Sequence, residues 1–231
     1  MSDVWERLQS VATESLDLMW YEFAKEGRES AIFAPLGAYP GAASWLAGCM
    51  AMADDCIVRK LAAMLIGWVD HPRAIEQLST MLRHERQAFA ADPLTANSVG
   101  EDIMFAATRW TASSHPEVAD AGRQVLAGMI RDALTGTPWN TANWATANLY
   151  RATNGSHDIL REIDTVMDEQ LKGQEFFRKA VTAVRGGDRE TLAKLATPPG
   201  PPEVLASDDP NFAQVSKLWA AVAAAEQTLQ Q

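Results

Sequence analysis

The sequence predicts an all-α protein. Apolar residues recur three or four positions apart almost throughout the chain, and a period-two alternation is nowhere sustained. Ala, Leu, Met, Glu, Gln and Arg, which are all good helix formers, dominate the chain. With 47% hydrophobic and 22% charged residues, the composition is typical of a globular protein and excludes intrinsic disorder. No apolar run reaches the ~18 residues that a membrane-spanning helix needs.

The expected helices follow these apolar stripes. They cover residues 4–23, 57–69, 75–89, 118–133, 159–171 and 215–229, and about ten helices are expected in all. A capping side chain followed by proline marks three helix starts, at Asp92-Pro93, Thr137-Pro138 and Asp209-Pro210. Gly186-Gly187-Asp188 predicts the end of one helix and the start of the next.

Three histidines mark a repeat of about 42 residues. His71, His115 and His157 each open an amphipathic segment, at spacings of 44 and 42 residues. We call the turn at each of these histidines a corner. The helix that precedes each corner ends in an aromatic residue, which is Trp68, Trp110 and Tyr150 in turn. Metal binding by the histidines is the alternative to helix capping. We expect capping, since repeats about 8–10 Å apart place equivalent side chains too far apart for one ion.

Helix pairs repeating every 40–47 residues resemble HEAT and armadillo repeats. This resemblance implies a right-handed α-α superhelix of stacked helix pairs. We expect the array to cover residues 1–196, with an atypical N-terminal part at residues 1–53. A Pro-rich linker at residues 197–209 then leads to a capping helix at residues 210–231. That helix docks either on the same chain or on another subunit.

The sequence contains none of the catalytic motifs that we sought. There is no Gly-x-Ser-x-Gly, no phosphate-binding glycine loop, no dinucleotide fingerprint and no helix-borne pair of metal ligands. Cys49 and Cys56 are expected to be reduced thiols, as in a cytoplasmic protein. We therefore expect neither a cofactor nor a metal, and an enzyme is not favoured.

One segment differs from the rest of the chain. Residues 133–150 carry no charge, and the stretch from Trp139 to Arg151 is rich in Trp and Asn. An amide can both donate to and accept from a peptide group, and an indole face suits an aliphatic stem or a cation. These side chains therefore form a candidate partner-binding strip, together with one aromatic of the preceding repeat: Trp139, Asn140, Asn143, Trp144, Asn148, Tyr150, Arg151 and Trp110.

The pattern Trp144-x-x-x-Asn148-Leu149-x-Arg151 resembles the inner-helix motif of armadillo repeats of the importin-alpha type. The resemblance implies that Asn148 pairs with the backbone of an extended peptide and that Trp144 forms a stacking wall for its side chains. In the alternative interpretation the amides satisfy buried turns and the Trp rings fill the core.

The charge balance indicates the kind of partner. With 20 Lys+Arg against 30 Asp+Glu, the formal net charge is −10 and the pI is near 4.9. Residues 1–55 hold −6 of this charge. We expect an acidic, non-catalytic module that binds a basic protein or peptide on a concave face, as a bacterial immunity or inhibitor protein would.

The alternative function is DNA repair, because the chain resembles HEAT-like alkylpurine DNA glycosylases in outline. Its candidate cationic groove would consist of Arg59, Lys60, Arg73, Arg83, Arg86 and Arg109. The acidic balance disfavours nucleic acid as a partner. The sequence leaves the oligomeric state open.

Overall fold

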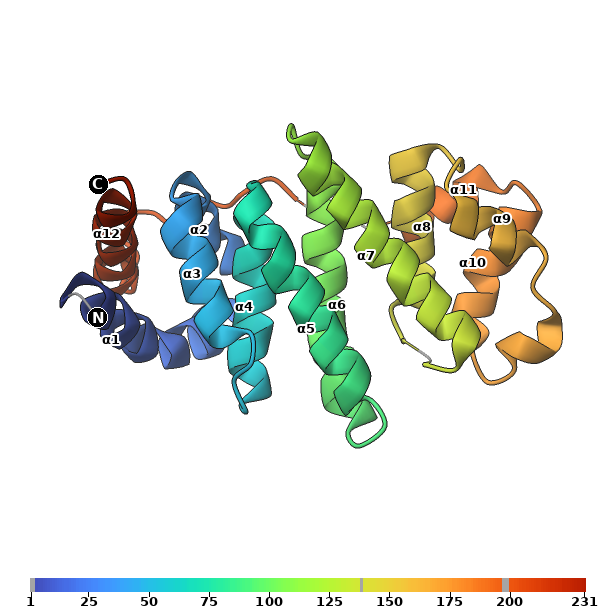
Figure 1. The fold of residues 1–231 in the computed structure, drawn as a ribbon, viewed down its shortest axis with the longest axis horizontal. Coiled ribbons are helices and arrows are strands. Elements are labelled where there is room, and N and C mark those ends of the chain that lie inside the picture. The colour runs from blue at the N-terminus through green and yellow to red at the C-terminus, as the bar shows by residue number, and fades with distance from the viewer. Residues whose placement is uncertain (1–2, 138, 197–199) are drawn as a thin grey trace. The chain divides into compact units, whose positions relative to one another are not determined.

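The computed structural model describes residues 3–137, 139–196 and 200–231, and every regular element within these ranges is helical (Figure 1). The α-helices are α1 (Asp3–Leu18), α2 (Glu29–Phe33), α3 (Pro40–Met50), α4 (Cys56–Trp68), α5 (Ile75–Ala88), α6 (Pro93–Trp110), α7 (Pro116–Thr135), α8 (Ala142–Thr153), α9 (Asp158–Asp164), α10 (Glu175–Arg185), α11 (Arg189–Leu195) and α12 (Phe212–Leu229). Shorter turns are the π-helical η1 (Met19–Phe23) and the 3-10 segments η2 (Ala24–Glu26), η3 (Ala34–Ala38), η4 (Pro72–Ala74) and η5 (Asp168–Leu171). The all-α prediction is confirmed, with twelve α-helices in the described residues where about ten were expected.

The three histidine corners stand at helix starts, as the sequence predicts. The ring nitrogen Nδ1 of His71 accepts a hydrogen bond from the backbone N–H of Arg73 at 3.1 Å. His157 accepts in the same way from Ile159 at 3.3 Å. His115 occupies the capping position of α7, although its ring makes no capping hydrogen bond. The capping role is therefore confirmed for the rings of His71 and His157.

The predicted Asp-Pro and Thr-Pro starts have mixed outcomes. Asp92 caps α6 by accepting from the N–H of Thr95, and Pro93 is the first helical residue. The Asp209-Pro210 start is wrong by two residues: Asp209 accepts from the N–H of Asn211 in a turn, and α12 begins at Phe212. Pro138 lies outside the described residues.

The helix expected over residues 159–171 is shorter than predicted. α9 ends at Asp164, and the Thr165 hydroxyl donates to the carbonyl of Glu162. The Gln170 side chain then accepts from the N–H of Met167, so side chains take the place of the next helical hydrogen bonds. Leu171, in η5, is also buried, so the apolar spacing in the sequence continues across this break although the helix does not.

The chain forms two compact units. Unit 1 consists of Met1–Met81 and Gly200–Gln231, and unit 2 of Leu82–Pro199, so the division falls within α5. Of the predicted linker, residues 197–199 lie outside the described ranges. Unit 1 is discontinuous in sequence, because its C-terminal part follows unit 2 along the chain.

In unit 1 the C-terminal helix docks on the same chain. α12 packs on α1 and α3, and Leu8, Leu46 and Leu218 are among the buried side chains of these helices. The guanidinium of Arg28 binds the carboxylates of Asp209 at 2.9 Å and Glu203 at 3.2 Å, which fixes the segment that leads into α12. In this single chain α12 therefore packs within unit 1.

Unit 2 is built around α8. This helix packs on α7, α10 and α11, and α6 packs on α7. Gly122 lets α6 and α7 approach closely, because a Cβ there would lie 2.6 Å from the carbonyl oxygen of Ala107. A Cβ at Gly128, also on α7, would come closest to the far end of the Arg86 side chain, at 2.7 Å, and would be in ordinary contact with Leu82 at 3.8 Å.

These two glycines give the first testable prediction. Gly122→Ala should lower the free energy of unfolding by about 1–3 kcal/mol, because the methyl group collides with backbone that cannot move aside. Gly128→Ala is the matched control on the same helix and should change stability by less than about 1 kcal/mol, since the flexible Arg86 can shift and alanine favours the helix. Urea denaturation of both variants checks this. Equal losses would contradict the close approach of α6 and α7.

The Arg28 cluster predicts a pH dependence. The hydrogen bond from Arg28 holds the pKa of Asp209 below its ordinary value of 3.8. The contact therefore stabilises the fold above that ordinary value, and this contribution is lost as the pH falls through the lowered, folded-state pKa. The stability difference between the wild type and Arg28→Gln should be full at neutral pH and should shrink below about pH 4. Thermal denaturation across pH measures it, and a difference that grows on acidification would contradict the contact.

Candidate functional site

The candidate strip lies mostly inside unit 2. Seven residues of α8 are buried: Ala142, Asn143, Ala145, Thr146, Ala147, Asn148 and Leu149. On the side of α10 and α11, Ala147 belongs to a cluster with Ala183, Leu192 and Ala196. A helix covered on most of its surface excludes charged side chains. This burial explains why residues 142–149 carry no charge.

Trp139 is fixed by contacts within unit 2. Its side chain is 2% exposed, and its indole N–H donates to Asp132 Oδ2 at 2.9 Å. The same carboxylate accepts from Arg86 Nε on α5. The ring meets Phe89 edge-on with the centroids 5.2 Å apart, and it lies against Gly100, where a Cβ would be 2.7 Å from the ring. Trp139 therefore contacts α6, α7 and Phe89, the residue that follows α5.

The two central amides of the strip are also buried. Asn148 is fully buried, and its Nδ2 donates to the sulfur of Met104 on α6 at 3.5 Å. Within the described residues, the Oδ1 atoms of Asn148 and Asn143 find no hydrogen-bond partner. Trp110, the candidate of the preceding repeat, is 1% exposed. These side chains point into the protein, where a peptide does not reach them.

Four strip residues are accessible in part. Asn140 and Arg151 are exposed, whereas Trp144 and Tyr150 are half-buried. The Tyr150 ring covers the turn at Gly155, where a Cβ would lie 2.8 Å from it. Trp144 and Arg151, seven residues apart, share one face of α8. Asn148 lies between them on the same side of the helix but is fully buried, so only Trp144 and Arg151 of this motif are accessible.

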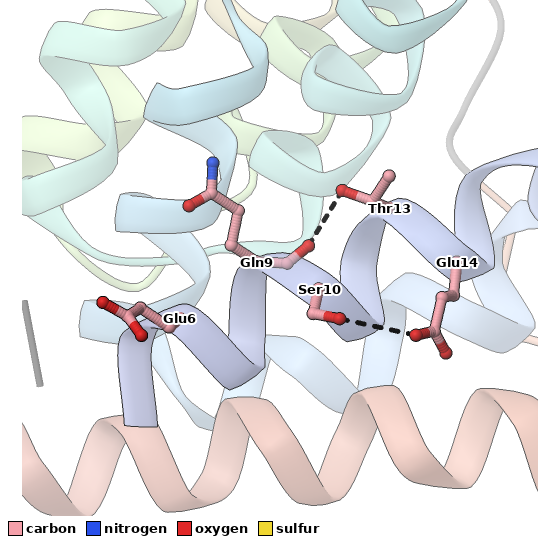
Figure 2. A pocket seen from close by; sticks show the side chains of 5 residues that line it. All are labelled: Glu6, Gln9, Ser10, Thr13 and Glu14. Carbon is pink, nitrogen blue, oxygen red and sulfur yellow. Dashed lines mark hydrogen bonds between the residues drawn. The ribbon is translucent and has the colours of Figure 1, made fainter. Parts of the chain in front are cut away.

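A hollow on α1 was not foreseen from the sequence. Glu6, Gln9, Ser10, Thr13 and Glu14 line a shallow, largely open depression on the surface of this helix (Figure 2). The lining residues are three or four positions apart, so they form one helical face. The Ser10 hydroxyl donates to Glu14 at 3.4 Å, and Thr13 donates to the Gln9 carbonyl at 2.9 Å. The i, i+3, i+4 spacing of these polar residues was the available sequence signal.

An aromatic pair lies one helical turn from this hollow. Trp5 precedes Gln9 by four residues on α1, and its ring lies 4.6 Å, between centroids, from that of Trp45 on α3. Both rings are half-buried, so part of each indole faces solvent. Exposed indole faces attract cationic side chains.

The negative charge is concentrated in unit 1. Its residues include seven Lys or Arg and fifteen Asp or Glu, a formal −8, whereas unit 2 has thirteen against fifteen, a formal −2. The positive charge of Arg28 is already engaged by Glu26, Glu203 and Asp209. Neither Glu6 nor Glu14 forms an ion pair with any described residue, so the face of α1 retains its negative charge.

A second hollow lies between α10 and α11 and has mixed charge. Its volume is about 530 Å³. Two of its charged groups have local structural roles, since Asp188 caps α11 through the N–H of Thr191 and Arg178 donates to the Leu171 carbonyl. The lining comprises Glu175, Arg178, Lys179, Thr182, Ala183, Gly186, Asp188 and Thr191. The balance of two bases and two acids indicates no particular ligand charge.

The titratable groups with altered pKa values do not form a reactive centre. Partial desolvation raises the pKa of the solvent-exposed Cys49 thiol, which disfavours the nucleophilic thiolate. Burial also raises the pKa of Glu29 and lowers that of Arg109 to about 10, so Arg109 remains a cation at neutral pH. Within residues 3–137, 139–196 and 200–231, no His, Cys, Asp and Glu side chains gather as a metal site would require. The helices in these ranges are also too short or too polar to cross a membrane.

Comparison with known proteins gives no relative. No protein-family model, curated protein sequence or solved structure matches this chain. Functional inference therefore rests on the residues and their geometry alone.

The buried amide of Asn148 leads to a prediction about the strip. Asn148→Leu should leave the free energy of unfolding within about 1 kcal/mol of the wild type or raise it, because an unsatisfied carbonyl oxygen and a weak bond to sulfur are replaced by apolar contact. Chemical denaturation measures the change. A loss above about 2 kcal/mol would show that the amide makes a strong hydrogen bond in the folded protein.

Proposed function

We propose that this chain is a non-catalytic interaction protein whose unit 1 binds a basic segment of another protein on the polar face of α1. The observation that carries the proposal is the concentration of charge: unit 1 holds a formal −8 of the total −10. A patch of one sign steers an oppositely charged partner and selects against others. The hollow between Glu6 and Glu14 supplies the contact surface.

The chemistry of this face suits arginine and lysine side chains. The carboxylates of Glu6 and Glu14 accept charge-assisted hydrogen bonds, and Gln9, Ser10 and Thr13 supply neutral donors and acceptors between them. The half-exposed Trp5 and Trp45 offer indole faces to a guanidinium. The opposite side of α1 is packed on α12, which holds the polar face in a fixed orientation.

The proposal also covers the way the helices stack and the cellular role of the protein. The helix pairs are proposed to stack as HEAT- or armadillo-like repeats in a right-handed superhelix, with the histidine corners at equivalent positions. An acidic cytoplasmic protein that occludes a basic toxin, as an immunity protein does, is one form that the proposed function takes.

The proposal is tested with a short arginine-rich peptide and a glutamate-rich peptide of equal length. The wild type should bind the arginine-rich peptide, more weakly as salt rises through an ionic strength of about 0.15 M, where the Debye length is about 8 Å. Glu6→Lys with Glu14→Lys should weaken binding by roughly tenfold or more, because two attractive contacts become repulsive. Fluorescence anisotropy provides the affinities.

The matched control changes the same net charge elsewhere. Glu162→Lys with Glu169→Lys reverses two exposed carboxylates of unit 2 and should change the affinity by less than about threefold once salt screens distant charges. Equal losses in both double variants would assign binding to net charge and contradict the α1 site. Preference for duplex DNA over the peptide would favour a nucleic-acid function.

A further inference from the structure

The helix that carries the acidic face is held by a helix from the other end of the sequence. Leu8, Ala12 and Ser15 form the buried side of α1, and α12 is its principal packing partner (Figure 1). Val215, Leu218 and Val222 are buried on α12. A 16-residue helix such as α1 is only marginally stable in water by itself. Its position therefore depends on α12.

α12 is in turn held on α2 and α3 by two polar contacts, of which the one to α3 is buried. The Trp219 indole N–H donates to the carbonyl of Ile32 at 2.9 Å. Glu226, which is 8% exposed, accepts from the N–H of Ala42 in the first turn of α3 at 2.7 Å. Gly41 leaves room for this carboxylate, because a Cβ there would lie 2.9 Å from Glu226 Oε2.

The segment before α12 adds an ionic fastening. Arg28 binds Glu203 and Asp209, and the N–H of Glu203 donates to the Ser30 hydroxyl at 3.2 Å. Residues 201–204 are exposed, whereas Leu205 is buried. The segment is thus held by a few polar contacts and one buried side chain, whereas α12 is held by continuous packing.

We propose that residues 200–231 act as a C-terminal latch that controls presentation of the acidic α1 face. When the latch opens, α1 loses its apolar support, and its polar face is no longer held as one binding surface. Opening of the latch and release of α1 are one cooperative event, separate from the opening of unit 2. The regulatory part of this inference rests on the proposed function, whereas the mechanical coupling of α1 to α12 does not.

Hydrogen exchange in the full-length chain tests the coupling. Glu226→Ala removes the buried acceptor at Ala42 and should raise exchange in both α12 and α1 by the same factor, about tenfold to a hundredfold. The amides of α7 and α8 should keep their wild-type rates. Glu226→Gln retains an acceptor oxygen, so its effect should be clearly smaller.

A second measurement needs no variant and covers the case in which Glu226→Ala does not fold. In the wild type, the free energy of opening is measured for each slowly exchanging amide as a function of urea concentration, at low urea. The amides of α1 and α12 should share one such curve, and their free energy of opening should be lower than that of the α7 amides. Separate curves for α1 and α12, or fast exchange in α12 while α1 stays protected, would overturn the latch.

Binding of the arginine-rich peptide separates the two proposals. In Glu226→Ala the latch is open in a larger fraction of the molecules. The affinity for the peptide should therefore fall by the same factor as the fraction of molecules with a closed latch. If the wild type does not bind the peptide but α1 and α12 still exchange together, the binding site is wrong and the coupling stands. If the peptide binds Glu226→Ala as tightly as the wild type although α1 is open, the latch does not control the site.

Discussion

The apolar contact between α1 and α12 is the constraint on which unit 1 depends. It joins the two segments of a unit that are separated in sequence by the whole of unit 2. The buried stripe of α1, centred on Leu8 and Ala12, has its main cover in α12. Because one helical face is committed to this packing, the opposite face must be polar, and in α1 it carries the carboxylates of Glu6 and Glu14, which form no ion pair with a described residue.

Unit 2 follows a different rule, in which small residues allow helices to approach closely. Gly122 brings α7 against the backbone of α6, and Gly100 leaves space for the ring of Trp139. The small side chains Ala147, Ala183 and Ala196 do the same for α8, α10 and α11. Close packing leaves no room for water on the buried side of α8, where the amide oxygens of Asn143 and Asn148 find no hydrogen-bond partner among the described residues.

The sequence predictions that are confirmed depend on interactions between residues close together in the sequence. Helical periodicity identified the all-α class, and capping chemistry placed His71, Asp92 and His157 at the starts of helices. Such features depend on neighbours within a few residues, which the sequence displays directly. The prediction that one helix continues to residue 171 is wrong, because the side chains of Thr165 and Gln170 compete with the backbone for hydrogen bonds.

Non-local features could not be derived in this way. Asn148 and Trp144 occupy similar positions in the sequence pattern, yet only Trp144 retains access to solvent, because the neighbours that cover α8 come from α6, α7, α10 and α11. The fastening of Glu226 to Ala42 joins residues 184 positions apart. No periodicity in the sequence reports such pairings, which depend on tertiary packing.

The discontinuity of unit 1 has a consequence for the order of events during synthesis. Unit 2 is one contiguous stretch, so all of its packing partners have been translated once residue 199 is made. Unit 1 must wait for α12, and until then the inner side of α1 has no cover. A newly made chain therefore passes through a stage in which this apolar face of α1 is exposed and can bind chaperones or neighbouring nascent chains.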